Sequence, residues 1–248
     1  MRLYFIALQF LTIIPLPFRL RCEGGDLGKS MAVFPLAGVT IGLLLAGGEY
    51  LLGMVFPRQV TDLLLIAILA AVTGALHLDG LADVCDGLAA RGGRERFLAV
   101  MKDSRIGAVG VVGLVLGLML KYCALLHVQT GIKRQALVVF PMVARFAQVQ
   151  IAVGARSART EGLGALFLAS AGWPQVLVAF AITLTLACLL LGGSGAWLLV
   201  AACLFTWLMK GWFHRLLGGI TGDVIGCVGE LNEILCLLVL VAMNGAAS

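Results

Sequence analysis

The sequence contains few charged residues for its length. Only 12% of its 248 residues are Asp, Glu, Lys or Arg, whereas a soluble protein carries about 25%. Hydrophobic residues make up 61% of the chain, and the mean hydropathy is +1.05. This composition excludes a soluble globular enzyme, a disordered chain and a nucleic-acid-binding domain. It predicts an integral membrane protein, in which the few remaining charges are costly and usually have a task.

Regularly spaced cysteines are also missing. The seven cysteines form no Cys-x-x-Cys pair and no repeating pattern, and several lie in apolar runs. A cysteine in an apolar run behaves as a small hydrophobic side chain. The sequence therefore predicts neither a disulfide framework nor a zinc site.

Long apolar runs dominate what is present. A membrane-crossing helix needs roughly 20 mostly apolar residues. The runs lie at residues 30–56, 63–78, 106–130, 135–155, 163–191, 196–209 and 234–243. Residues 1–17 are expected to form a retained hydrophobic helix. We predict an all-α fold, a polytopic integral membrane helical bundle of about six to seven transmembrane helices, as a single domain over residues 1–248.

The loops alternate between strongly and weakly basic. If each run crosses once, and residues 163–171 do not span by themselves, the more basic loops share one side. Cytoplasmic loops carry excess Lys and Arg, which also accounts for the net charge of +5 without a nucleic-acid partner. We therefore expect residues 79–105 and 210–233 to face the cytoplasm together.

Three carboxylates stand close together in the first of these segments. Asp79, Asp83 and Asp86 follow the spacing i, i+4, i+7, which puts them on one face of a helix. Three such anions repel each other strongly at a membrane edge. A divalent cation relieves that repulsion, and oxygen ligands suit Mg²⁺, or Mn²⁺, better than zinc. The alternative is a helix end whose acids project into water.

Basic residues follow the acids directly. Arg91, Arg94 and Arg96 fit either a phosphorylated substrate or the cytoplasmic-loop signal alone. Lys102, Asp103, Ser104 and Arg105 favour a functional role, because an acid, a hydroxyl and two cations sit together at a membrane boundary. His77, two residues before Asp79, fits a ligand or substrate contact as well as a structural role.

A second polar cluster spans residues 215–233. It contains Arg215, several glycines and the acids Asp223, Glu230 and Glu233. The glycines allow a close backbone approach to a ligand, or they mediate helix packing in lipid. Two acidic helices on one membrane face could share a metal pair. Together the clusters predict a cytoplasm-facing, Mg²⁺-dependent site that acts on a phosphorylated substrate.

The motifs at residues 77–87, 101–107 and 218–233 resemble those of the cobalamin synthase family, the adenosylcobinamide-GDP ribazoletransferases. Residues 10–17 and 34–38 also resemble its N-terminal features. The likeness extends over almost the whole chain, and Cys85 is one departure from the pattern.

The resemblance implies a substrate pair and a reaction. Adenosylcobinamide-GDP would react with α-ribazole or its 5′-phosphate, giving adenosylcobalamin or its 5′-phosphate and GMP. The implied enzyme is a Mg²⁺-dependent phosphotransferase of a bacterial or archaeal cytoplasmic (inner) membrane. A homo-oligomer and an association with other cobalamin-pathway enzymes are left open.

The resemblance also suggests roles for the residues. The expected catalytic residues are Asp79, Asp83 and Asp86. The expected metal ligands are these three with Asp103, Asp223 and Glu230. The expected substrate-binding residues are His77, Arg91, Arg94, Lys102, Ser104, Arg105, Arg215 and Glu233.

Three other classes compete with this interpretation. A CDP-alcohol phosphotransferase would have Arg where Asp83 stands, and the downstream spacing does not fit. A UbiA-type prenyltransferase would have an Asn ahead of Asp79. An ion-coupled transporter would place its acids near the bilayer midplane in paired repeats, and no repeat is visible in the sequence.

Overall fold

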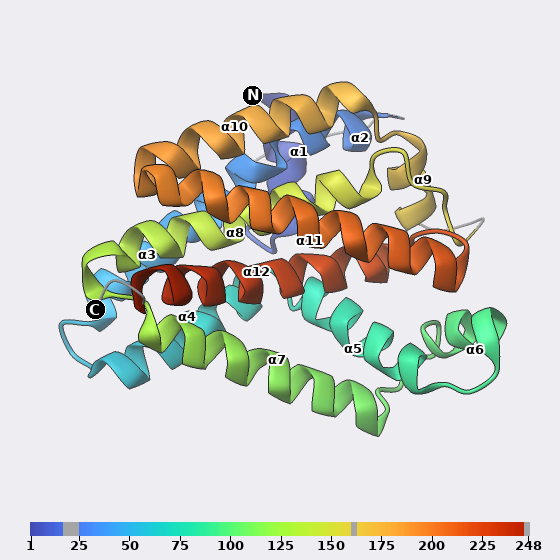
Figure 1. Ribbon diagram of the computed structural model, residues 1–248, viewed down its shortest axis with the longest axis horizontal. Coiled ribbons are helices and arrows are strands. Elements are labelled where there is room, and N and C mark those ends of the chain that lie inside the picture. The colour runs from blue at the N-terminus through green and yellow to red at the C-terminus, as the bar shows by residue number, and fades with distance from the viewer. Residues whose placement is uncertain (17–24, 160–162, 246–248) are drawn as a thin grey trace.

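The apolar runs fold into long helices, because a backbone in lipid must satisfy its hydrogen bonds within itself. A computed structural model describes residues 1–16, 25–159 and 163–245. Pro17 and the first part of the basic loop 19–29 lie outside the described residues. The helices (Figure 1) are α1 (Arg2–Leu11), α2 (Asp26–Ser30), η1 (Met31–Val33), α3 (Phe34–Leu52), α4 (Arg58–Val72), α5 (Leu76–Ala89), α6 (Gly93–Val100), α7 (Ala108–His127), η2 (Thr130–Ile132), α8 (Lys133–Ala152), α9 (Leu163–Ala169), α10 (Trp173–Leu191), α11 (Gly193–Leu217) and α12 (Gly222–Gly245).

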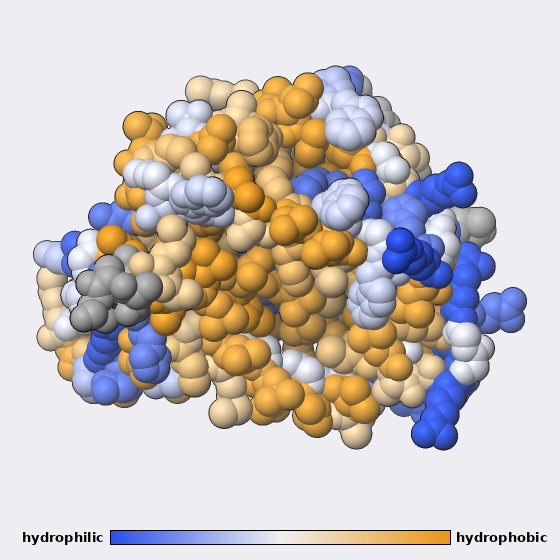
Figure 2. Space-filling view, in the orientation of Figure 1, coloured by the Kyte–Doolittle hydropathy of each residue, from blue (hydrophilic) through white to orange (hydrophobic). Residues whose placement is uncertain are grey.

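Six stretches of the described chain are long and apolar enough to cross a membrane. They are Asp26–Leu52, Ala108–His127, Thr130–Ala152, Trp173–Leu191, Gly193–Leu217 and Gly222–Met243. A seventh span is counted if α4 and α5 cross as one bent pair. Figure 2 shows a hydrophobic belt between hydrophilic side chains that gather at the two ends of the molecule. The predicted all-α membrane bundle of six to seven spans is confirmed.

The run at residues 163–191 divides as expected. α9 has seven residues and is too short to span, and α10 begins at Trp173 after a break at Gly172. Pro174 stands in the first turn of α10, where its missing N–H costs no hydrogen bond. The N-terminal apolar stretch forms α1, which is only ten residues long.

The run at residues 63–78 differs from its prediction as one apolar span. α4 ends at Val72, and α5 starts at Leu76 at an angle of 90° to it. Gly74 and Ala75 have φ values of 59° and 55°, a left-handed conformation that ends a helix. The acidic segment therefore begins its own helix at the bend, and Asp79 stands in the first turn of that helix.

The last two spans are longer than the apolar runs that predicted them. α11 continues to Leu217, and α12 starts at Gly222 although the apolar run begins only at residue 234. α12 therefore carries Asp223, Glu230 and Glu233 on one continuous helix. Apolarity alone underestimates α12, because Lys121 and Arg145 on other helices neutralise its buried Glu230 and Glu233.

Helix α8 forms the centre of the bundle. Almost all of its side chains between Ala136 and Ala152 are buried. α3 packs closely along it, because the α carbons of Gly38 and Gly42 face the α8 backbone at Met142 and Val138. A Cβ atom at either glycine would stand within 2.6 Å of that backbone. Small residues thus permit the close contact, as is common in membrane bundles.

A buried ion cluster joins α7, α8 and α12. Lys121 Nζ lies 2.6 Å from carboxylate oxygens of both Glu230 and Glu233. Arg145 Nη1 lies 3.3 Å from the other oxygen of Glu233. Two cations and two anions balance, so the cluster carries no net charge into the membrane interior, where unpaired charge is costly.

Removing the central cation of this cluster should destabilise the protein. In Lys121→Met, two buried carboxylates would retain only the more distant Arg145. Leaving a buried ion without its partner costs about 3–5 kcal/mol, so we expect thermal unfolding in detergent to begin about 10 °C lower.

The matched control is Arg134→Met, which breaks the ion pair of an exposed arginine with Glu49. An exposed pair contributes roughly 0–1 kcal/mol, so this variant should unfold within a few degrees of the wild type. Equal unfolding temperatures for the two variants would show that the buried cluster does not hold the helices together.

Candidate active site

The site is built where α5 and α12 pack against each other in antiparallel directions. A Cβ atom at Gly80 would lie 2.6 Å from the carbonyl oxygen of Asp223, and one at Gly226 would lie 3.3 Å from the Cα of His77. The two backbones therefore lie in direct contact at these glycines. For Gly226 the packing interpretation of the glycines is the one that the structure supports.

The predicted acidic row lies along α5. Asp79, Asp83 and Asp86 are all within this helix, so their spacing puts them on one side of it, about one turn apart. The carboxylates of Asp79, Asp223 and Asp86 all lie near enough to act electrostatically on Asp83. α5 and α12 thus bring Asp223 to the row, as the sequence predicted for residues on the same membrane face.

Asp86 has a second environment within this row. Its two carboxylate oxygens accept hydrogen bonds from the backbone N–H groups of Gly107 and Gly110, each at 2.7 Å. These groups belong to the start of α7, where a helix favours a negative charge. A Cβ at either glycine would come within 2.4 Å of the carboxylate. The glycine that ends the motif at residues 101–107 therefore makes room for Asp86.

Asp223 stands in the first turn of α12 and is paired with a basic residue. Arg159 Nη1 lies 2.9 Å from Asp223 Oδ2. The segment that carries Arg159 is held to the start of α12 by a parallel bridge between Ser157 and Ile220. Gly219 allows this approach, because a Cβ there would meet the backbone at residues 156–158.

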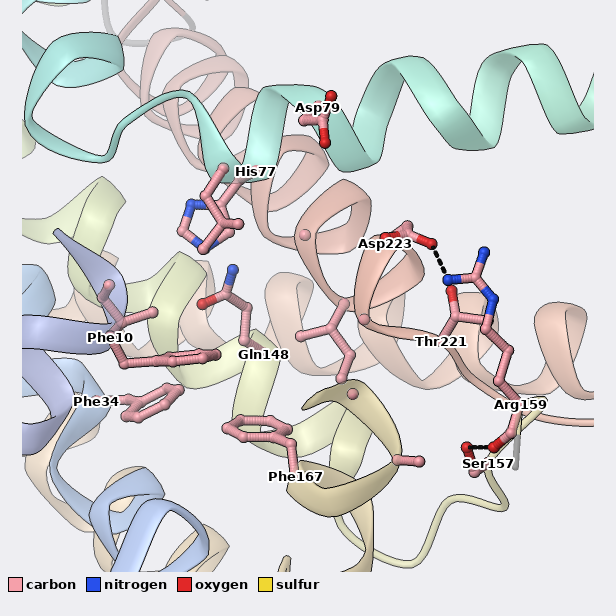
Figure 3. Close-up of a pocket in the computed structure, with 17 residues that line it drawn as sticks. Phe10, Phe34, His77, Asp79, Gln148, Ser157, Arg159, Phe167, Thr221 and Asp223 are labelled. Atoms are coloured by element: carbon pink, nitrogen blue, oxygen red, sulfur yellow. Dashed lines mark hydrogen bonds and ion pairs between the residues drawn. The ribbon is translucent and has the colours of Figure 1, made fainter. Parts of the chain in front are cut away.

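A cavity of about 300 Å³ opens beside this contact. Its wall on one side is aromatic and aliphatic, and on the other side it is polar (Figure 3). The apolar part is formed by Phe10, Leu11, Phe34, Phe167 and Ile225, and the polar part by Asp79, Ser157, Arg159, Thr221 and Asp223, with His77 and Gln148 between them.

A second, shallower hollow of about 550 Å³ lies at the far end of α5. Among the residues that line it are Asp86, Arg91, Arg96, Asp103 and Arg105. The Arg105 guanidinium donates hydrogen bonds to both carboxylate oxygens of Asp103, at 3.0 and 2.8 Å, and lowers the pKa of Asp103 to about 2. The Asp103 carboxylate therefore stays ionised and engaged at neutral pH.

The structure does not bring every predicted residue to the row. Arg94 donates hydrogen bonds to the carbonyl oxygens of Leu217 and Ala158, so it ties α6 to the end of α11. Lys102, Ser104 and Arg215 are exposed and do not line the cavity or the second hollow.

Glu230 and Glu233 also lie elsewhere. Both are buried in the ion cluster with Lys121, deeper along α12 than Asp223, and neither lines the cavity or the hollow. Seven residues of helix separate Glu230 from Asp223 by about 10 Å along the axis. The assignment of Glu230 to a metal and of Glu233 to a substrate stays a prediction, and the observed partner of both is a lysine.

The donor set of the row fits a magnesium ion that is bound together with a substrate. Within residues 1–16, 25–159 and 163–245, no three acid, His or Cys side chains converge into a metal cage. Mg²⁺ seldom needs one, because it is usually held by one or two carboxylates, water and the phosphates of a substrate. Asp79, Asp83 and Asp223 offer such carboxylates.

Several residues of the site were missing from the sequence-based prediction. Gln148 and Phe167 lie in apolar stretches that carry no chemical signal, and Arg159 is a single charge in a loop. Phe10 and Phe34 lie in the two N-terminal segments that resemble the family, but the resemblance assigns them no role. Lys121 and Arg145 did carry a signal, because each is a lone cation within an apolar run that faces acids on another helix.

The contact between α5 and α12 can be tested at Gly80. In Gly80→Ala the new methyl group would meet the Asp223 backbone, which cannot move as a side-chain end can. Such overpacking costs about 1–3 kcal/mol, so we expect a lower thermal unfolding temperature in detergent. The control Gly211→Ala, at a helical glycine with nothing within 4 Å of the added atom, should leave the temperature unchanged or raise it slightly. A Gly80→Ala protein as stable as this control would contradict the close packing.

Comparison with known proteins identifies the family of the chain. The family model described as cobalamin-5-phosphate synthase matches residues 3–241. An adenosylcobinamide-GDP ribazoletransferase from Geotalea daltonii is 66% identical over 245 residues, covering 99% of each chain. Proteins with the same name from Pseudomonas entomophila and a Thermoanaerobacter species are 39% and 32% identical, and each alignment covers at least 96% of both chains. No solved structure matches the chain significantly. The chain belongs to the cobalamin-5-phosphate synthase family.

Proposed function

We propose that this protein transfers the cobinamide phosphate of adenosylcobinamide-GDP to α-ribazole or α-ribazole 5′-phosphate and releases GMP. The names of the relatives supply the substrates. One observation in this chain carries the proposal. The acidic row on α5 extends from the cavity, which Asp79 lines, to the arginine-rich hollow, which Asp86 lines, with Asp83 between them.

The reaction joins two substrates at one phosphorus atom. A ribose hydroxyl oxygen of α-ribazole forms a bond to the phosphorus attached to cobinamide, and the bond from that phosphorus to the GMP oxygen breaks. The hydroxyl proton passes to a carboxylate of the row. Asp79 is the acceptor that we favour, because it lines the cavity from which the hydroxyl would approach.

The basic hollow suits the diphosphate of the second substrate. Arg91 and Arg96 line it, and a guanidinium binds phosphate oxygens in pairs. Arg105 also lines the hollow and adds positive charge there, while two of its N–H groups stay on Asp103. Their charges would oppose the negative charge that develops on departing GMP. Asp86 would then act by fixing α7 against α5, since both of its oxygens are hydrogen-bonded to the α7 backbone.

We also propose Mg²⁺ as the resident metal, with Mn²⁺ as a substitute. Asp79, Asp83 and Asp223 would hold it, because these carboxylates meet where α5 packs on α12. Asp103 lies in the separate hollow at the far end of α5, and Glu230 is buried with Lys121. When bound, the ion would neutralise charge on the diphosphate during an in-line displacement.

The distribution of basic residues supports a site on the cytoplasmic side of a cytoplasmic membrane. Figure 2 shows strongly hydrophilic side chains at the end of the bundle that carries α6. The described residues at this end include Arg91, Arg94, Arg96, Lys102, Arg105, Arg156, Arg159 and Arg215, and those at the opposite end include Arg58, Lys133 and Arg134. Excess positive charge marks the cytoplasmic side.

The proposed reaction predicts a specific loss of activity in Asp83→Asn. The purified wild-type protein with Mg²⁺, adenosylcobinamide-GDP and α-ribazole should release GMP, measured by chromatography. Losing one carboxylate of the row should reduce the rate about 100-fold or more, while membrane insertion and thermal unfolding stay at wild-type values.

Glu49→Gln is the matched control for this variant, because Glu49 pairs with Arg134 at the opposite end of the bundle. It should retain wild-type turnover. Full turnover by Asp83→Asn would refute the role of the acidic row. A wild-type protein that releases no GMP would refute the proposed function itself.

Metal removal gives a separate prediction. Treatment with EDTA should abolish GMP release, and adding Mg²⁺ or Mn²⁺ should restore it. Ca²⁺ should restore much less, because it prefers longer bonds and more ligands than this donor set offers. Unchanged turnover in the chelator would remove Mg²⁺ from the proposal and leave the substrate assignment standing.

A further inference from the structure

We propose that the cavity beside Asp79 is the binding site for α-ribazole, with its dimethylbenzimidazole ring against the wall of three phenylalanines and Gln148 donating a hydrogen bond to the free ring nitrogen. This inference rests on the proposed function, whose relatives are named for ribazole, and adds where and how that substrate is recognised.

The phenylalanines form an aromatic group at the apolar end of the cavity. Phe10, Phe34 and Phe167 come from α1, α3 and α9, and their ring centroids lie 5.6–6.1 Å apart. The planes of Phe10 and Phe167 are inclined by only 16°. Rings from three separate elements thus converge on one wall (Figure 3). Such a wall favours a flat, apolar ring, since aromatic contacts add to the gain from burial.

Two buried polar side chains on the same cavity lack partners. Gln148 is 1% exposed, and neither its Oε1 nor its Nε2 has a hydrogen-bond partner among the described residues. His77 is 4% exposed, and its Nδ1 is also without one. Figure 3 shows the Gln148 amide between His77 and the phenylalanines, with its oxygen on the side of Phe10 and its nitrogen toward His77. A half-turn of the amide group presents the N–H to a ring that lies against the phenylalanines. A buried amide left unsatisfied is costly, so this position calls for a ligand that can hydrogen-bond within an apolar wall.

The polar and apolar groups that line the cavity distinguish the dimethylbenzimidazole ring of α-ribazole from the guanine ring of the other substrate. Dimethylbenzimidazole has one free ring nitrogen, an acceptor, and an edge covered by two methyl groups. Guanine carries donors and acceptors along its edge, and the phenylalanines together with Leu11 and Ile225 would leave several of them unpaired. An apolar site disfavours such groups because they lose their hydrogen bonds to water and gain none from the protein. The cavity therefore suits the benzimidazole better than the guanine of GDP.

The volume of the cavity and the direction in which the ribose would extend agree with this assignment. A cavity of about 300 Å³ is at the lower end of ligand sites, which is appropriate for a nucleoside and far too small for a corrinoid. With the base among the phenylalanines, the ribose would extend toward Asp79, Thr221 and Asp223 at the polar end. Its hydroxyl groups would then reach the acidic row, where the proposed bond to phosphorus forms.

The experiment compares α-ribazole with the matching dimethylindole riboside, which has a carbon in place of the free ring nitrogen. Affinity of the full-length protein in detergent is measured by equilibrium dialysis in EDTA, which is expected to prevent turnover, with and without adenosylcobinamide-GDP. The wild type should bind α-ribazole about fivefold to tenfold more tightly than the indole analogue, the value of one buried hydrogen bond.

Three variants assign this preference to the cavity. Gln148→Leu should bind the two nucleosides equally. Phe167→Leu should weaken both alike and keep the preference. Gln150→Leu is the matched control, because Gln150 is on the same helix but donates to the carbonyl oxygen of Cys203 outside the cavity. It should behave as the wild type does.

Each other outcome overturns the inference. These are no binding of α-ribazole to the wild type in either condition, no preference in the wild type, or a preference that survives in Gln148→Leu. If Gln148→Leu instead raises only the KM for adenosylcobinamide-GDP, the cavity holds the guanine. GMP release by the wild type is scored separately, so a failure of this inference is distinguishable from a failure of the proposed function.

Discussion

The contact between α5 and α12 at Gly80 is the constraint on which the rest of the site depends. Because Gly80 has no side chain, the backbone of α5 can lie directly against Asp223. This contact adds a carboxylate from the last helix to the acids of α5, and it forms one wall of the cavity that holds Asp79 and His77. A larger residue at this position would separate the two halves of the site even if every acid stayed in the sequence.

The charged side chains are balanced in the interior of the bundle but not at the site. Inside the bundle Lys121 and Arg145 balance Glu230 and Glu233, and such a closed set holds helices together without attracting a further ion. Along α5 the acids outnumber their cations, since Arg159 pairs with Asp223 alone. An unbalanced set of acids at the edge of a low-dielectric region attracts a cation. This contrast explains why we assign the chemistry to α5 and the start of α12, and a structural role to the ion cluster in the middle of α12.

Much of the fold could be predicted from the sequence, because hydrophobic length fixes where helices can cross a membrane. The acidic row was also predictable, since Asp79, Asp83 and Asp86 follow a helical spacing. The groups that each polar side chain contacts in the fold could not be predicted in the same way. Glu230 has the correct spacing from Asp223, but a lysine on α7 decides its role. Gln148 is a single amide in an apolar helix, and only the folded chain places it in a cavity.

The bend between α4 and α5 has a consequence for how the sequence can vary. A straight membrane helix must be apolar along its length, so it has little room for carboxylates. The left-handed residues Gly74 and Ala75 divide this part of the chain into two helices at an angle of 90°, and the two helices have different roles. α4 is mostly apolar, whereas α5 does not need to be apolar and can carry acidic side chains. Substitutions in α4 are then constrained by solubility in lipid, and those in α5 by chemistry, although only three residues separate the two helices.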